Sequence, residues 1–62
     1  MSVDTKIPRD PAMLLSFINL KLRDCYSSLD ALCDDMQIER EEICTRLAMI
    51  DYVYDPGINQ FV

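Results

Sequence analysis

The sequence predicts a mainly α-helical domain of three helices, including a helix-turn-helix, followed by a short C-terminal β-hairpin. Apolar residues recur at spacings of three and four through residues 10–50, which is the period of amphipathic helices. After residue 51 the pattern alternates, as in β-strands. The length of 62 residues suits one domain. We therefore expect an extended N-terminal segment (1–9), three helices (10–50) and a hairpin (52–62).

The first helix is expected to run from Pro11 to Cys25. Asp10 can accept hydrogen bonds from the free N–H groups of the first turn, and proline is favoured at the first helical position. The apolar residues of this helix form two adjacent stripes, which are Leu14, Leu15, Ile18, Leu22 and Cys25, and beside them Met13, Phe17 and Leu20. The polar strip that remains consists of Ser16, Asn19 and Arg23. Because so wide an apolar face exceeds what short neighbouring helices can cover, we expect one stripe to contact a second chain.

Two shorter helices are expected to follow. Ser27 and Asp30 resemble a capping box, which predicts the start of a second helix that ends near Met36. A turn at residues 37–38 leads into a third helix over residues 39–50. The predicted inward-facing residues are Leu29, Leu32, Cys33 and Met36 in the second helix, and Ile43, Leu47 and Ile50 in the third.

The last residues are expected to form a hairpin with strands at 52–54 and 59–62 around a turn at 55–58. We predict that Tyr52 lies opposite Phe61 and that Tyr54 lies opposite Asn59, giving an aromatic cross-strand pair. Because Pro56 suits ordinary turns better than primed ones, a four-residue loop is favoured. With this hairpin, the helix-turn-helix looks like a reduced winged helix.

Nucleic-acid binding is the alternative function for such a fold, but the charges do not favour it. In DNA-binding relatives of this motif the second helix enters the major groove. Residues 39–46 hold three glutamates against two arginines, whereas binding a duplex depends on cations. A regulator of this kind would need a dimer that gathers its cations on one face, namely Arg9, Lys21, Arg23, Arg40 and Arg46. We therefore predict a solvated acidic face, with a docking surface for an unidentified protein partner as the alternative, and we do not expect a nucleic-acid partner.

Catalysis is not expected, and no metal or other cofactor is expected either. The chain has no histidine to act as a general base, and its only glycine falls in the hairpin turn. The three cysteines, Cys25, Cys33 and Cys44, fit neither a zinc site nor a disulfide framework. We expect all three to be free and buried as small apolar side chains.

Charge is unevenly placed along the chain. Residues 1–24 carry four basic and three acidic groups (+1), whereas residues 25–62 carry two and eight (−6). Lys21 lies between the two apolar stripes. Its stem is expected to lie along apolar surface, and the alternative is an ion pair with an acidic group of a partner chain.

Residues 1–6 lack the apolar run of a signal peptide, and no stretch approaches the roughly 20 apolar residues of a membrane span. We therefore expect a cytoplasmic protein that does not associate with membranes.

Four sequence phrases carry a family resemblance that spans residues 7–61. They are Asp10-Pro11-x-Met13-Leu14-Leu15-Ser16, Asn19-x-Lys21-Leu22-Arg23-Asp24, Tyr26-Ser27-Ser28-Leu29-Asp30 and Asn59-Gln60-Phe61. They resemble the small bacterial proteins grouped as domain of unknown function 4250 (DUF4250). The resemblance implies no activity, cofactor or functional residue. It also suggests that Asp51 stands where relatives have a glycine after the third helix.

These observations predict a non-catalytic protein-interaction module that forms a homodimer. The residues predicted to mediate self-association are Met13, Phe17, Leu20 and Lys21. Ser16, Asn19 and Arg23 are predicted to form the polar surface beside them.

Overall fold

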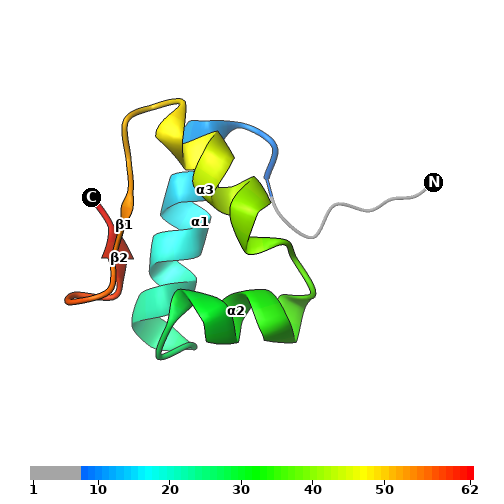
Figure 1. Ribbon diagram of the computed structural model, residues 1–62, viewed down its shortest axis with the longest axis vertical. Helices are drawn as coiled ribbons and strands as arrows, with labels where there is room; N and C mark the ends of the chain where they lie inside the picture. Colours follow the sequence, from blue (N-terminus) through cyan, green and yellow to red (C-terminus); the bar gives the residue numbers. More distant parts are fainter. Residues whose placement is uncertain (1–7) are drawn as a thin grey trace.

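The computed structural model describes residues 8–62 and shows three helices followed by a two-stranded antiparallel hairpin, so the predicted fold class is confirmed (Figure 1). The elements are α1 (Pro11–Asp24), α2 (Leu29–Met36), α3 (Arg40–Ala48), β1 (Tyr54–Asp55) and β2 (Gln60–Phe61). Most of the predicted extended segment, residues 1–7, lies outside the described residues. None of the helices in residues 8–62 has the length and apolar content needed to cross a membrane.

The start of α1 follows the prediction. The Asp10 carboxylate accepts a hydrogen bond from the Met13 N–H (3.2 Å), and Pro11 occupies the first turn. This arrangement satisfies one of the backbone donors that a helix N-terminus leaves free. The helix ends at Asp24, one residue earlier than expected, with Cys25 as its C-cap.

The predicted cap of α2 was wrong by one residue. Ser28, not Ser27, is the N-cap, and its hydroxyl accepts a hydrogen bond from the Ala31 N–H (3.1 Å). The helix ends at Met36 as predicted, because Gln37 adopts a left-handed conformation (φ 56°) that stops it.

The third helix is shorter than predicted at both ends. Glu39 is its N-cap but makes no side-chain capping bond, and regular α-helix ends at Ala48. The backbone N–H groups of Met49, Ile50 and Asp51 each bond to the carbonyl group three residues earlier, at 3.0–3.3 Å. The helix therefore ends in a tighter turn of the 3₁₀ type. Asp51 then adopts φ 66°, the left-handed conformation that glycine adopts most easily.

The predicted register of the hairpin was wrong by two residues. Tyr54 pairs with Phe61 and Asp55 with Gln60, so a four-residue loop, as expected, connects the strands. Two backbone hydrogen bonds between Val53 and Val62 (3.1 and 2.9 Å) continue the same pairing. Tyr54 therefore replaces Tyr52 as the aromatic partner of Phe61, with ring centroids 5.4 Å apart.

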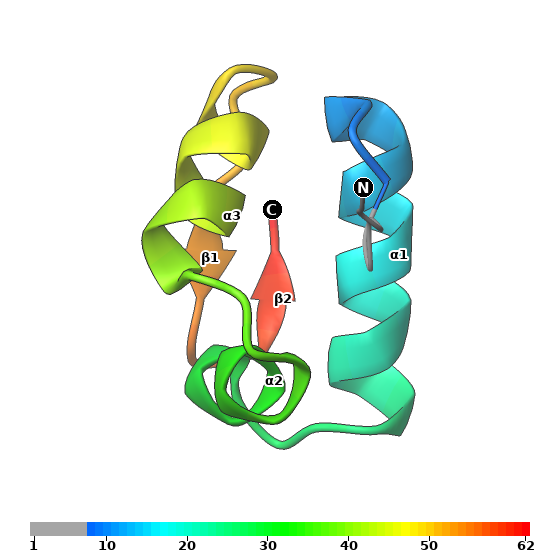
Figure 2. The same cartoon turned by 90° about the vertical axis from the view of Figure 1, so that its right-hand side faces the viewer.

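One core holds these elements together. In Figure 1, α2 lies across the direction of α1, and the hairpin lies on one side of the helices; Figure 2 shows α1 and α3 on opposite sides. Phe61 is the buried hairpin residue, with 2% of its surface exposed. The other buried residues come from the helices and are Leu14, Ile18, Leu22, Leu29, Leu32, Cys33, Ile43 and Leu47.

Ile50 and Met36, both predicted to face inwards, are only partly buried against this core. Each sits at or beyond the end of its helix, where the neighbouring elements no longer cover it completely.

Candidate interaction surface

The outward face of α1 carries a stripe of apolar side chains that this chain leaves largely uncovered. Met13 and Leu20 are 63% and 51% exposed. Phe17 lies between them along the helix and is half-buried, because part of its ring packs against the core. Residues spaced by three and four positions share one helix face. We call Met13, Phe17 and Leu20 the α1 stripe.

Lys21 lies at the C-terminal end of the α1 stripe. Its ammonium nitrogen lies 5.5 Å from the centre of the Phe17 ring, within the range of a cation–π contact. Lys21 as a whole is half-buried, which agrees with a side chain that follows apolar surface. The four residues predicted for self-association therefore lie together on one helix.

The three residues predicted as polar surface have different surroundings. Ser16 and Arg23 are exposed, and Arg23 bonds to the adjacent Asp24 (3.3 Å). Asn19 is half-buried and faces the hairpin. Its carboxamide accepts a hydrogen bond from the Phe61 N–H (2.8 Å) and donates one to the Phe61 carbonyl (3.1 Å). Asn19 was predicted to belong to the polar surface; it lies partly at the surface, but its carboxamide is bonded within the fold.

A second asparagine fixes the other end of the hairpin. Asn59 adopts φ 55° and donates hydrogen bonds to the carbonyl groups of Leu22 and Tyr26, both at 3.0 Å. Its side-chain oxygen accepts a bond from the Tyr54 hydroxyl (2.6 Å), which in turn accepts the Leu29 N–H at 3.2 Å. These bonds connect the hairpin to the end of α1 and the start of α2.

The sequence contained a partial signal for Asn59. Asparagine after a proline-glycine turn is a residue that tolerates positive φ. Its long-range partners left no comparable signal, since they lie 33 and 37 positions away in the chain.

A shallow depression separates the α1 stripe from the hairpin. It is lined by Leu15, Ser16, Asn19, Leu20, Arg23 and Gln60. The Gln60 amide donates to the Asn19 carbonyl (3.0 Å), so two of the residues that line this depression are bonded to each other within the fold.

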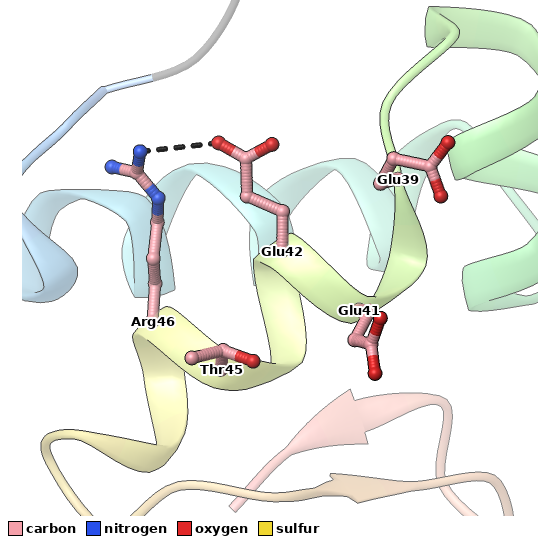
Figure 3. Close-up of a pocket in the computed structure, with 5 residues that line it drawn as sticks. All are labelled: Glu39, Glu41, Glu42, Thr45 and Arg46. Atoms are coloured by element: carbon pink, nitrogen blue, oxygen red, sulfur yellow. Dashed lines mark hydrogen bonds and ion pairs between the residues drawn. The ribbon is translucent and has the colours of Figure 1, made fainter.

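The face of α3 that a DNA-binding protein would present carries paired charges. Figure 3 shows the Arg46 guanidinium beside the Glu42 carboxylate, at 3.1 Å, and Arg46 also binds the Arg9 carbonyl (3.2 Å). Arg40 lies 3.7 Å from Asp30. An open depression on this face is lined by Glu39, Glu41, Glu42, Thr45 and Arg46. Both arginines of α3 therefore lie against carboxylates of the same chain.

The cysteines are free, but only one is buried as predicted. Cys33 is buried, Cys44 is half-buried and Cys25 is exposed because it follows the last turn of α1. Burial raises the pKa of the Cys33 thiol, with a further contribution from the nearby Cys44. Within residues 8–62, no three cysteine or acidic side chains lie close enough to hold a metal ion.

Tyr26 donates a hydrogen bond from its hydroxyl to the Asp35 carboxylate (2.6 Å). This bond raises the pKa of the Tyr26 hydroxyl, because it stabilises the protonated form beside a negative charge. The contact connects the end of α1 to α2 on the molecular surface.

Comparison with known proteins gave one family. Searches of curated proteins and of solved structures found no match. A family model described as "Domain of unknown function (DUF4250)" matches residues 8–61, nearly the whole chain and nearly the same span as the resemblance in the sequence. The chain therefore belongs to the DUF4250 family.

Proposed function

We propose that this protein is a non-catalytic protein-interaction module that self-associates through the α1 stripe. The observation that carries the proposal is the exposure of Met13 and Leu20 on either side of the half-buried Phe17. Other large apolar side chains are exposed in residues 8–62, but they lie at loops and strand ends: Met49, Val53, Ile58 and Val62. The α1 stripe differs from these because a regular helix holds its side chains in a fixed row.

A second copy of the chain is the partner that the composition favours. A chain of this size buries only about 60% of the surface that it exposes when unfolded, so further burial of apolar area adds a useful share of stability. An apolar helix face is complementary to another copy of itself, and symmetric dimers are the commonest protein assemblies. A helix of 14 residues is about 21 Å long, which limits the contact to the small end of interface sizes. We therefore expect weak association that depends on protein concentration.

Sedimentation equilibrium over a concentration series tests this proposal. The informative variants are Leu20→Glu and Met13→Glu, because both side chains point to solvent and both changes leave the core intact. Met49→Glu is the matched control, since Met49 is 73% exposed outside the stripe. Circular dichroism verifies that each variant is folded.

We expect a concentration-dependent dimer for the wild type and for Met49→Glu, and folded monomers for the two stripe variants. A wild type that stays monomeric up to millimolar concentration would exclude the proposal. So would a Leu20→Glu variant that dimerises as well as the wild type.

A further inference from the structure

Two residues of opposite charge, Asp10 and Lys21, stand before and after the α1 stripe along the chain. The Asp10 carboxylate is held next to Met13 by its 3.2 Å capping bond, at the N-terminal end. The Lys21 ammonium lies over the Phe17 ring, towards the C-terminal end. Eleven residues separate Asp10 from Lys21, which corresponds to about 16 Å along a helix.

Neither charged group belongs to an ion pair among residues 8–62. The ion pairs of residues 8–62 involve Arg23, Arg40 and Arg46, and none involves Lys21 or Asp10. Asp24 lies one turn from Lys21 on the same helix, but its carboxylate binds Arg23 instead. Both ends of the stripe therefore keep a charge that can interact with another molecule.

From this pattern we infer that two copies pack their α1 helices antiparallel, with Lys21 of each chain against Asp10 of the other. The inference rests on the proposed self-association and specifies its geometry. In a two-fold symmetric contact, residue i of one chain meets residue j of its partner, and j meets i. An antiparallel arrangement forms the Lys21–Asp10 pair twice, on either side of the shared apolar stripe. A parallel arrangement would instead bring the two lysines together and the two aspartates together.

The dipoles of the two helices favour the same arrangement. Helices side by side in parallel place like partial charges next to each other, whereas antiparallel helices place the positive end of one beside the negative end of the other. The charge pattern and the helix dipoles thus favour the same orientation.

Charge variants of α1 test the cross-chain pair by sedimentation equilibrium. Lys21→Met keeps the long apolar stem and removes the charge, and Asp10→Asn removes the other charge while keeping a residue that caps helices well. Each change is expected to weaken dimerisation by about 2- to 30-fold, since two exposed ion pairs are lost per dimer. The double variant should be little weaker than either single one. Arg40→Met is the control, because this exposed cation lies on α3, where it pairs with Asp30 of the same chain, and the change should leave the dissociation constant unchanged.

A spin label on Cys25 tests the orientation directly. This thiol is exposed at the end of α1, and Cys44→Ser removes the half-buried thiol that could also react. Labelled chains are mixed with isotope-labelled Cys25→Ser chains, and broadening of the amide signals of the second population is recorded. An antiparallel dimer broadens residues 12–14, at the far end of the partner's α1, more than residues 24–27.

The outcomes separate the two proposals. Dimerisation with broadening centred on residues 24–27, or with additive effects of Lys21→Met and Asp10→Asn, would overturn the antiparallel pairing and leave self-association standing. A strictly monomeric wild type would overturn both.

Discussion

The carboxamide of Asn19 binds both backbone groups of Phe61, accepting from its N–H at 2.8 Å and donating to its carbonyl at 3.1 Å. In an antiparallel pair, every second residue directs its N–H and carbonyl away from the partner strand. Phe61 is such a residue, because the hydrogen bonds between Val53 and Val62 leave the Tyr54–Phe61 pair unbonded. Asn19 thus takes the place that a third strand would occupy at the outer edge of β2.

Replacing Asn19 should loosen the hairpin from the helices. Asn19→Ala leaves the half-buried N–H and carbonyl of Phe61 without their partners, which should lower the free energy of unfolding by about 1–3 kcal/mol. Urea denaturation followed by circular dichroism measures this loss. Ser16→Ala, at an exposed position on the same helix, is the control and should change stability by less than about 0.5 kcal/mol. Equal effects of the two substitutions would contradict a structural role for the amide.

Asp51 is expected to limit stability. Its φ of 66° costs a residue with a β-carbon about 1–2 kcal/mol, and its side chain makes none of the hydrogen bonds found in residues 8–62. Asp51→Gly removes that cost but raises the entropy of the unfolded chain, so we expect a net gain of about 0.5 kcal/mol. Asp51→Val should destabilise, because branching at the β-carbon disfavours this conformation further. Thermal unfolding ranks the variants, and a glycine variant less stable than the wild type would refute the account.

The two adjacent serines before α2 should respond differently to alanine. Ser28→Ala removes the 3.1 Å bond to the Ala31 N–H and should cost about 1 kcal/mol, the usual value of an N-cap. Ser27→Ala removes an exposed hydroxyl outside the helix and should cost less than about 0.5 kcal/mol. Urea denaturation of the two variants measures both losses of stability. A larger loss for Ser27→Ala than for Ser28→Ala would identify Ser27 as the cap.

Tyr26 should make the stability of the fold depend on pH in alkaline solution. Its pKa is raised in the folded state above the ordinary value of 10.0, chiefly by the hydrogen bond to Asp35. The contribution of protonated Tyr26 to the free energy of unfolding is therefore fully present below about pH 10. It is lost as pH rises through the higher pKa of the folded state. Asp35→Asn should lower the pKa of Tyr26, as read from its ring signals in an NMR titration. Asp34→Asn removes the neighbouring carboxylate instead, and it should leave the pKa of Tyr26 unchanged.

The helices could be predicted from the sequence because their signals are local. Asp10 with Pro11, and the recurrence of Leu14, Ile18 and Leu22, define α1 within one stretch of chain. The cap of α2 was misplaced because Ser27 and Ser28 are equivalent by residue type, and only the path of the chain decides between them.

The hairpin register and the role of Asn19 depend on contacts that are distant in sequence. With positive φ at Asn59, the four-residue loop spans 56–59, one residue later than the predicted loop at 55–58, and this shifts the strand pairing by two residues. Asn19 looked like a surface residue because its partner, Phe61, lies 42 positions further along the chain. The α1 stripe was visible in the sequence, but the exposure of Met13 and Leu20 required the arrangement of the neighbouring elements.

The bond between Asn19 and Phe61 also has a consequence for the order of folding. Closing a flexible loop of 42 residues costs an entropy term of about 3 kcal/mol, whereas the helices and the hairpin form from residues close in sequence. Docking of the hairpin on the helices should therefore be a late folding event. It is complete when the Phe61 N–H forms its hydrogen bond to the Asn19 side chain. In pulse-labelling hydrogen exchange, the Phe61 amide proton should gain protection after the amide protons of α1 and α2. This single amide would therefore report the time at which the hairpin docks on the helices.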